Sequence, residues 1–242
     1  MLSKRKLAFT FDDGMLSNYT FTAKVLKEYG FSATFFITAT GRLWDDTELE
    51  EPQISWSQLH EMNDDGFEIA NHTYTHYSTE SLSPEEWGQS VQMMEVVFAQ
   101  KKFLKPVTLS YPAFRCNKAA RNVAKSMGYK FARAGYKPNS PNEYNFQKDL
   151  ACSPWNRNEV SYYIPGKTNP HMIFVTGIIN GNERNHCYNC ELFVEDIEKA
   201  PEGAIPIFAG HGMPIEVRQR AFVEMIEYCA KNNWVPVALK DI

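Results

Sequence analysis

The feature that most constrains the fold of this 242-residue chain is its regular alternation of strand and helix patterns. Residues 6–11 and 33–38 are short apolar runs typical of strands, and residues 17–29 between them have helical spacing. Strands that alternate with helices form a mainly parallel sheet with crossover helices. We therefore predict an α/β fold.

The same pattern continues to the end of the chain. Ser55 is placed to cap a helix over residues 55–65, and Ser83 to cap one over residues 83–102. The other predicted strands cover residues 67–70, 107–111, 131–134, 172–179, 205–209 and 234–239, and the other predicted helices cover residues 117–127, 190–199 and 215–232. Residues 136–170 are rich in Pro, Asn and Ser and are predicted to be mainly loop. No repeat or linker divides the chain, so we expect a single domain over residues 1–242.

Composition limits the partners and the location of the protein. Hydrophobic residues make up 43% of the chain and charged residues 22%, which is enough apolar surface for a packed core. A net charge of −4 and the lack of a basic patch argue against nucleic acid and anionic membranes as partners. The start of the sequence lacks the apolar core of a signal peptide, so we expect a cytoplasmic protein, or a secreted one if a leader was removed. The 5 cysteines are scattered and odd in number, which fits reduced thiols.

Two short motifs bring metal-binding and acid–base groups to strand ends. Residues 10–14 read Thr-Phe-Asp-Asp-Gly, and residues 72–76 read His-Thr-Tyr-Thr-His. Asp, His and His are the ligands of an open catalytic metal site, and a second Asp can take a proton from a water molecule there. The candidate residues all fall at or just after the carboxyl ends of predicted strands, where parallel barrels assemble their active sites. They are Asp12, Asp13, His72, His76, Tyr111 and His211.

Each of these motifs also has a plainer interpretation. Asp-Asp-Gly is a common turn sequence, and a His pair four residues apart can lie on an exposed helix face. His211 can simply end a strand. Cys187 and Cys190, preceded by His186, look like half of a structural zinc site, but a second Cys pair is missing and we do not predict zinc there. Because both main motifs directly follow predicted strands, we favour the catalytic interpretation.

Four motifs taken in order resemble those of the polysaccharide deacetylases, the NodB-homology group of carbohydrate esterases. The first motif of that family stands unaltered at residues 10–14, and its second motif, a His pair, matches residues 72–76. The resemblance is carried by residues 6–130 and resumes near residue 205. It implies a NodB-like fold, which is a distorted (β/α) barrel of about seven parallel strands.

The resemblance also implies roles for individual residues. Asp13, His72 and His76 would bind a divalent metal, and Asp12 would be the general base. His211 would protonate the leaving amine. A site of Asp and two His accepts zinc, cobalt, nickel or iron, of which zinc is our first choice.

The third motif departs from the family pattern. Many members carry Arg-x-Pro-Tyr, in which the Arg holds the catalytic Asp, but Ser110 stands at the position of that Arg. The string is closer to a subgroup with Tyr-Pro-Tyr-Gly, so Tyr111, Pro112 and Ala113 are expected to form the oxyanion and substrate loop. In some members an Arg of the next motif replaces the missing one, and Arg157 is our candidate for that role.

The predicted function is therefore a metal-dependent hydrolase of C–N amide bonds that removes N-acetyl groups from an amino sugar or oligosaccharide. A small cyclic amide, imide or ureide is the alternative substrate, favoured by the lack of an evident secretion signal. A non-catalytic carbohydrate-binding relative is a further alternative, against which the retained ligands and base argue. Nothing in the motifs indicates the oligomeric state.

Overall fold

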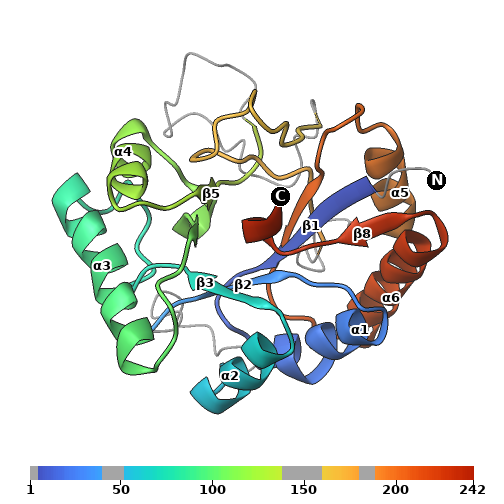
Figure 1. The fold of residues 1–242 in the computed structure, drawn as a ribbon, viewed down its shortest axis with the longest axis horizontal. Helices are drawn as coiled ribbons and strands as arrows, with labels where there is room; N and C mark the ends of the chain where they lie inside the picture. The colour runs from blue at the N-terminus through green and yellow to red at the C-terminus, as the bar shows by residue number, and fades with distance from the viewer. Residues whose placement is uncertain (1–4, 40–51, 138–159, 180–188) are drawn as a thin grey trace.

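The computed structural model describes residues 5–39, 52–137, 160–179 and 189–242 (Figure 1). The strands of these residues are β1 (Arg5–Phe11), β2 (Thr34–Ile37), β3 (Glu68–Asn71), β4 (Thr108–Ser110), β5 (Phe131–Arg133), β6 (Gly177–Ile178), β7 (Ile207–Gly210) and β8 (Trp234–Pro236). Their helices are α1 (Ala23–Glu28), α2 (Trp56–Asp64), α3 (Pro84–Gln100), α4 (Lys118–Ser126), α5 (Cys190–Glu198) and α6 (Glu216–Lys231). The alternation expected from the sequence is thus confirmed.

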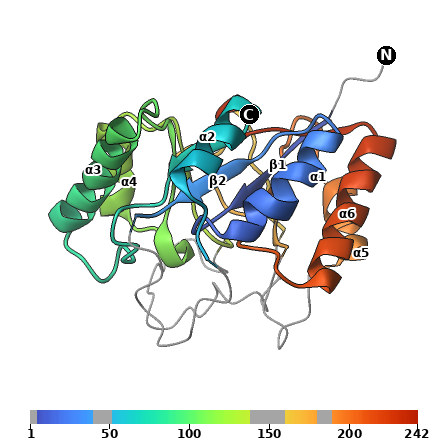
Figure 2. The same ribbon diagram turned by 90° about the horizontal axis from the view of Figure 1, so that it is seen from below.

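The strands form one curled parallel sheet with the helices outside it. Its order is β5-β4-β3-β2-β1-β7-β6, and β8 pairs with the first half of β1. Figure 2 shows α3 and α4 at one side of the sheet and α5 and α6 at the other, with α1 and α2 between them. The predicted α/β fold with a distorted barrel of parallel strands is confirmed.

The segment before β6 links the two edges of this curled sheet. Ile173 N–H donates to Ala132 O, and Val175 N–H donates to Gly135 O, so this segment first runs along β5. Thr176 N–H then donates to Ile207 O, and β6 continues along β7. Because the segment changes partner at this point, only β6 forms a regular ladder, and the strand predicted over residues 172–179 is shorter than expected.

The helix starts follow the local sequence. Ser55 and Ser83 each accept a hydrogen bond from the backbone N–H three residues on, and the side chains of Gln58 and Glu86 accept one from the backbone N–H of the cap residue. The side chain of Asn117 caps α4 by accepting a hydrogen bond from Ala120 N–H. The boundaries predicted for these three helices are confirmed to within two residues.

Two further predicted elements differ from the structure. The helix expected over residues 17–29 begins with a π-helical turn, Asn18–Thr22, before α1. The last strand ends at Pro236 instead of residue 239, and Leu239–Asp241 forms a 3-10 turn. Val237 N–H still donates to Leu7 O, and β8 ends there because the second half of β1 pairs with β2 and β7 instead. In Figure 1 this turn, in red, lies in the middle of the ring of strands.

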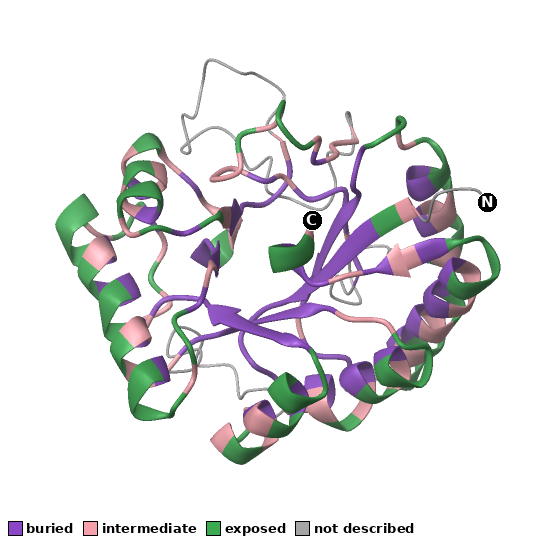
Figure 3. Cartoon of the chain, viewed as in Figure 1, coloured by how far each residue is buried: buried purple, intermediate pink, exposed green. Residues whose placement is uncertain are grey.

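The core has two layers that follow the alternation of strand side chains. Phe9 of β1 packs against Phe193 of α5, Phe208 of β7 and Phe222 of α6, with ring centroids 5.3–5.8 Å from its own. Ala8, its neighbour in sequence, belongs to the cluster inside the curl instead. Figure 3 shows the result: strands buried along most of their length and helices buried only on the inner face.

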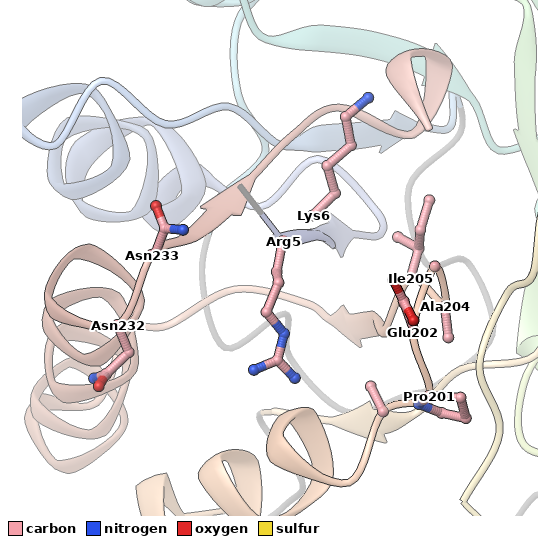
Figure 4. A pocket seen from close by; sticks show the side chains of 10 residues that line it. Arg5, Lys6, Pro201, Glu202, Ala204, Ile205, Asn232 and Asn233 are labelled. Carbon is pink, nitrogen blue, oxygen red and sulfur yellow. The ribbon is translucent and has the colours of Figure 1, made fainter. Parts of the chain in front are cut away.

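The two ends of the sheet differ in what they carry. At the amino ends of β1, β7 and β8 lies a pocket of about 650 Å³ (Figure 4). Arg5 in this pocket lies over the ring of Trp234, 3.9 Å from its centroid, and pairs with Glu198 at 2.9 Å. The motif residues lie at the opposite, carboxyl end. Within the described residues, no helix combines the length and apolar character that crossing a membrane requires.

Candidate active site

The candidate site is built where neighbouring parallel strands end. Asp12 and Asp13 directly follow β1, His72 follows β3, and His211 follows β7. Because β1 lies between β2 and β7 in the sheet, these strand ends meet at one rim. The site therefore depends on the fold, not on closeness in sequence.

The metal-ligand candidates share one buried cluster. His72 Nε2 lies 3.4 Å from Asp13 Oδ1, and His76 Nε2 lies 3.0 Å from the same oxygen. One ligand atom from each residue lies within 4.8 Å of the other two. Asp13 and His72 are buried and His76 is half-buried. This donor set, and its closeness, fit a divalent cation such as zinc.

The orientation of His72 suits a metal ligand. Its Nδ1–H donates to the carbonyl oxygen of Ser110 at 3.0 Å. In the neutral ring this leaves the lone pair on Nε2, the atom that faces Asp13. Metal-binding His residues are commonly fixed by a carbonyl in this way.

A tight turn, not a helix, carries the His pair. Asn71 Oδ1 accepts from Thr73 N–H at 2.7 Å, and Thr73 Oγ1 accepts from His76 N–H at 3.1 Å. Thr73 and His76 both have left-handed backbones, with φ of +66° and +58°. Ser90 of α3 supports the turn with hydrogen bonds to the residues between the two His. The helix-face interpretation of this motif is therefore wrong.

The charges in the cluster are consistent with cation binding. Burial opposes ionisation of Asp13, but hydrogen bonds from His72 and His76 hold its pKa well below the usual range. Burial likewise opposes a charge on His72, yet Asp12 and Asp13 raise its pKa. The two carboxylates thus favour positive charge at His72, and a bound metal would take the place of the proton on that ring.

Asp12 contacts a different set of side chains from those that surround Asp13. Arg133, which ends β5, forms an ion pair with both carboxylate oxygens, and Ser110 Oγ donates to Oδ1 at 3.2 Å. Both Asp12 and Arg133 are buried. Burial raises the pKa of Asp12, but the positive charges of Arg133, His72 and His211 together outweigh burial, and the net pKa is lowered. Asp12 is therefore held as a carboxylate.

Arg133 is the site residue that sequence reasoning missed. Ser110 and Arg133 are paired in the register of β4 and β5, so the Arg reaches Asp12 from the strand beside the expected position. Arg157, our sequence candidate for this role, lies outside the described residues. A signal was present in the sequence, because Arg133 is a cation at the end of an otherwise apolar predicted strand.

His211 faces the other carboxylate oxygen of Asp13 from the one that His72 and His76 face. Its Nε2 is 3.5 Å from Asp13 Oδ2, and its side chain is 28% exposed. The loop that follows His211 is fixed by a hydrogen bond from Met213 N–H to Ser17 Oγ at 2.5 Å. His211 is thus both near the metal-ligand candidates and open to an incoming molecule.

The third motif forms a turn, Pro112–Phe114, at the end of β4. The hydrogen bonds that close the turn come from the N–H groups of Phe114 and Arg115, so the Ala113 N–H takes part in neither. Ala113 is exposed at the rim. This N–H can therefore face a molecule in the site.

Tyr111 has its side chain directed away from the rim. The ring is fully buried and stacks on Trp87 of α3, with centroids 5.6 Å apart, and its hydroxyl donates to His171 O at 2.9 Å. The Tyr111 side chain thus anchors the turn from behind, and the expected part of Tyr111 in the substrate loop stays a prediction. Packing against an aromatic partner stabilises the ring more than exposure would.

Fold and site together define an α/β-barrel protein with a candidate metal centre at the carboxyl rim of its strands. A family model described as polysaccharide deacetylase matches residues 2–132, and the chain belongs to this family. The resemblance inferred from the motifs is therefore confirmed.

Individual relatives extend this comparison. YxkH of Bacillus subtilis (strain 168), provisionally named a polysaccharide deacetylase, is 29% identical over 127 residues, which are 52% of this chain and 43% of that protein. The chain thus matches less than half the length of this curated relative. A family 4 carbohydrate esterase from Streptomyces lividans, solved with acetate, has a TM-score of 0.60 at 15% identity and is matched over 96% of this chain and 91% of its own. A family 4 acetyl xylan esterase from Clostridium thermocellum, solved with a cobalt ion, has a TM-score of 0.57 at 16% identity, over 98% and 89%. At these identities the two structures establish the fold.

Proposed function

We propose that this protein is a metal-dependent hydrolase that removes N-acetyl groups from an amino sugar or an oligosaccharide. The observation that carries the proposal is the division of labour between two adjacent carboxylates. Asp13 faces two His side chains, whereas Asp12 faces Arg133. One acid is thus placed to bind a cation and the other to remain an ionised base.

Asp13, His72 and His76 are the residues that would hold the metal. Zinc is our first choice, and cobalt, nickel and iron suit the same ligands. The metal, when bound, polarises an amide carbonyl and makes a water molecule a stronger acid. The remaining chemistry falls to side chains and one backbone group of the chain itself.

Asp12 is the proposed general base. It is buried and held as a carboxylate, so it can take the proton of the attacking water at neutral pH. Arg133 and Ser110 bind the carboxylate and fix its direction. Because the base is already oriented, proton transfer does not require the entropy cost of ordering its side chain.

Two groups across the site would handle the rest of the reaction. The Ala113 N–H would stabilise negative charge on the former carbonyl oxygen. His211, partly exposed and 3.5 Å from Asp13, would give its proton to the leaving nitrogen. The acid and the base then come from β7 and β1, which are neighbours in the sheet.

The test is acetate release from N-acetylglucosamine oligomers by purified protein. The protein is stripped of metal, assayed, then reloaded separately with zinc, cobalt, nickel and iron. We expect acetate only after reloading. A folded protein that binds metal but releases no acetate from these oligomers would contradict the substrate assignment, and cyclic amides and ureides would be assayed next.

A further inference from the structure

The turn of the third motif ends in a residue with an unfavourable backbone, Phe114. Its φ is +60°, and Ala113 before it has a φ of +53°. Residues other than Gly, Asn and Asp rarely have a backbone in this left-handed region. Such a conformation persists only where the surroundings hold it, and it is often found at functional sites.

The surroundings of Phe114 are shaped to hold it. Gly135 N–H donates to Phe114 O at 3.0 Å. A Cβ atom on Gly135 would lie only 2.6 Å from the Cβ of Phe114, so only glycine leaves room for this side chain. The ring then packs against a small apolar cluster that includes Val175 and Ala209.

Two charged or titratable groups of the site lie against this ring. The Cζ of Arg133 is 4.9 Å from the ring centroid of Phe114. Phe36, inside the barrel, lies 5.4 Å from the same guanidinium. The ring of His211 meets Phe114 edge-on, with centroids 6.0 Å apart and planes at 82°. One aromatic side chain therefore contacts both the cation that holds Asp12 and the proposed acid.

We infer that Phe114 is a positioning residue that covers the ion pair of Arg133 with Asp12 and steadies the ring of His211. A cation over an aromatic face is attracted to it, and the attraction grows when water is excluded. Water kept away from an ion pair also strengthens the pair itself. The inference rests on the proposed function, in which Asp12 is the base and His211 the acid.

The kinetic test compares Phe114→Leu with Phe114→Tyr. Leu keeps much of the bulk and no aromatic face, whereas Tyr keeps both. For Phe114→Leu we expect kcat to fall about tenfold with KM changed less than about twofold, since only positioning is lost. Phe114→Tyr should restore most of kcat. Equal kcat for wild type and Phe114→Leu would overturn the inference.

The matched control is Phe131→Leu. Phe131 is likewise half-buried, but it begins β5 and packs against Tyr163 at the end of the strand away from the site, with centroids 5.8 Å apart. We expect this variant to lose some thermal stability and to keep its kcat. If Phe114→Leu fails to fold, Phe114→Asn, which tolerates a left-handed backbone, replaces it in every comparison.

A second readout does not need activity. Exchange of the Arg133 guanidinium protons with water is measured by 15N NMR, with the signals assigned through Arg133→Lys. Phe114→Leu should speed this exchange at least about fivefold because the cover is lost, and Phe131→Leu should leave it unchanged. An unchanged rate in Phe114→Leu would overturn the inference.

The two readouts separate the inference from the function on which it rests. A wild-type protein that releases no acetate would contradict the proposed function, while the exchange rate would still report whether Phe114 covers Arg133. Acetate release by wild type with kcat and exchange both unaffected in Phe114→Leu would instead contradict only the inference. A double-mutant cycle with Arg133→Lys should show the Phe114→Leu effect shrinking, because the ring acts through the guanidinium.

Discussion

The two ends of the sheet each bury a carboxylate, and they treat it in opposite ways. Asp12 at the carboxyl end is 2% exposed, and Glu68 at the amino end is 4% exposed. Asp12 pairs with a guanidinium and its pKa is lowered. Glu68 forms no such ion pair among the described residues; burial has the larger effect and raises its pKa above the usual 4.5, although the charge of Lys240 lowers it.

Glu68 is a structural acceptor. Its oxygens accept hydrogen bonds from Thr34 Oγ1 at 2.7 Å, Thr108 Oγ1 at 2.8 Å and Lys240 N–H at 3.0 Å. Leu239 N–H in turn donates to Thr34 Oγ1 at 2.7 Å. These bonds fix the C-terminal 3-10 turn inside the amino end of the curl. Neutral donors can satisfy the hydrogen-bonding needs of a buried carboxyl group, but they do not keep it ionised as a base for proton transfer.

The comparison shows that burial alone does not identify a catalytic acid. What distinguishes Asp12 is a cation that keeps it ionised and an adjacent carboxylate, Asp13, committed to the His residues. Changes at the carboxyl end should therefore alter chemistry, and changes at the amino end should alter only stability.

The largest effect is expected for His72→Ala. Removing this ligand should abolish stoichiometric metal binding and lower activity by far more than about 100-fold, which is the upper range for loss of a group that merely supports a ligand. Metal content by mass spectrometry and acetate release are measured together. The control is His60→Ala, on α2 and away from the rim, which should keep both. Full metal content in His72→Ala would show that the ligand assignment is wrong.

Asp12→Asn should separate metal binding from catalysis. Asn keeps the size and most hydrogen bonds of Asp but cannot take a proton, so activity should fall about 10²- to 10⁴-fold while metal content stays at the wild-type level. Activity within threefold of wild type would mean that another group is the base. Asp13→Asn is the matched comparison, because it should lose metal as well.

How much of this could be predicted depends on the distance over which the signal acts. Ser55 and Ser83 cap their helices through residues three positions away, so the motif is local and can be read directly. The gathering of Asp13, His72 and His76 also follows from strand ends that share a rim. Short-range patterns and the rule for parallel strands are sufficient for these features.

The partners of the two buried carboxylates could not be predicted in that way. Arg133 is 121 residues from Asp12, and Lys240 is 172 residues from Glu68. Which strand delivers the guanidinium depends on the register between β4 and β5, and a shift of one residue would turn Arg133 to the other face. A polar residue at a strand start likewise looks solvent-exposed until the C-terminal turn is placed against it.

Arg133→Met should affect both activity and stability. The substitution leaves Asp12 buried beside no cation, which costs about 3 kcal/mol or more for a fully buried pair. Urea unfolding of the metal-free protein measures this cost, and acetate release by the metal-loaded protein should fall at least about tenfold as the base loses its orientation. An unchanged unfolding midpoint would contradict a close ion pair. Arg115→Met, which breaks the half-buried pair with Glu80, is the control and should cost about 1 kcal/mol or less.

Glu68→Gln should have the smallest effect. The stability that Glu68 contributes depends on pH in the opposite sense to the stability that Asp12 contributes. A carboxyl whose folded-state pKa is raised adds stability that is complete below its unfolded pKa of about 4.5 and is lost as pH rises through the folded value. Wild type should therefore lose this contribution between pH 4.5 and the raised pKa, whereas Asp12, with its lowered pKa, contributes most above the unfolded value.

Gln carries no charge, so Glu68→Gln should flatten this part of the stability curve, stay within about 1 kcal/mol of wild type at neutral pH and keep kcat unchanged. Urea unfolding at pH 5 and pH 8 measures the difference, and the exposed Glu85→Gln is the control. A loss of acetate release in Glu68→Gln without a loss of stability would mean that the amino end also takes part in the chemistry. The contrast between the two carboxylates would then fail, because the carboxyl group without an ion pair would be acting on the substrate as well.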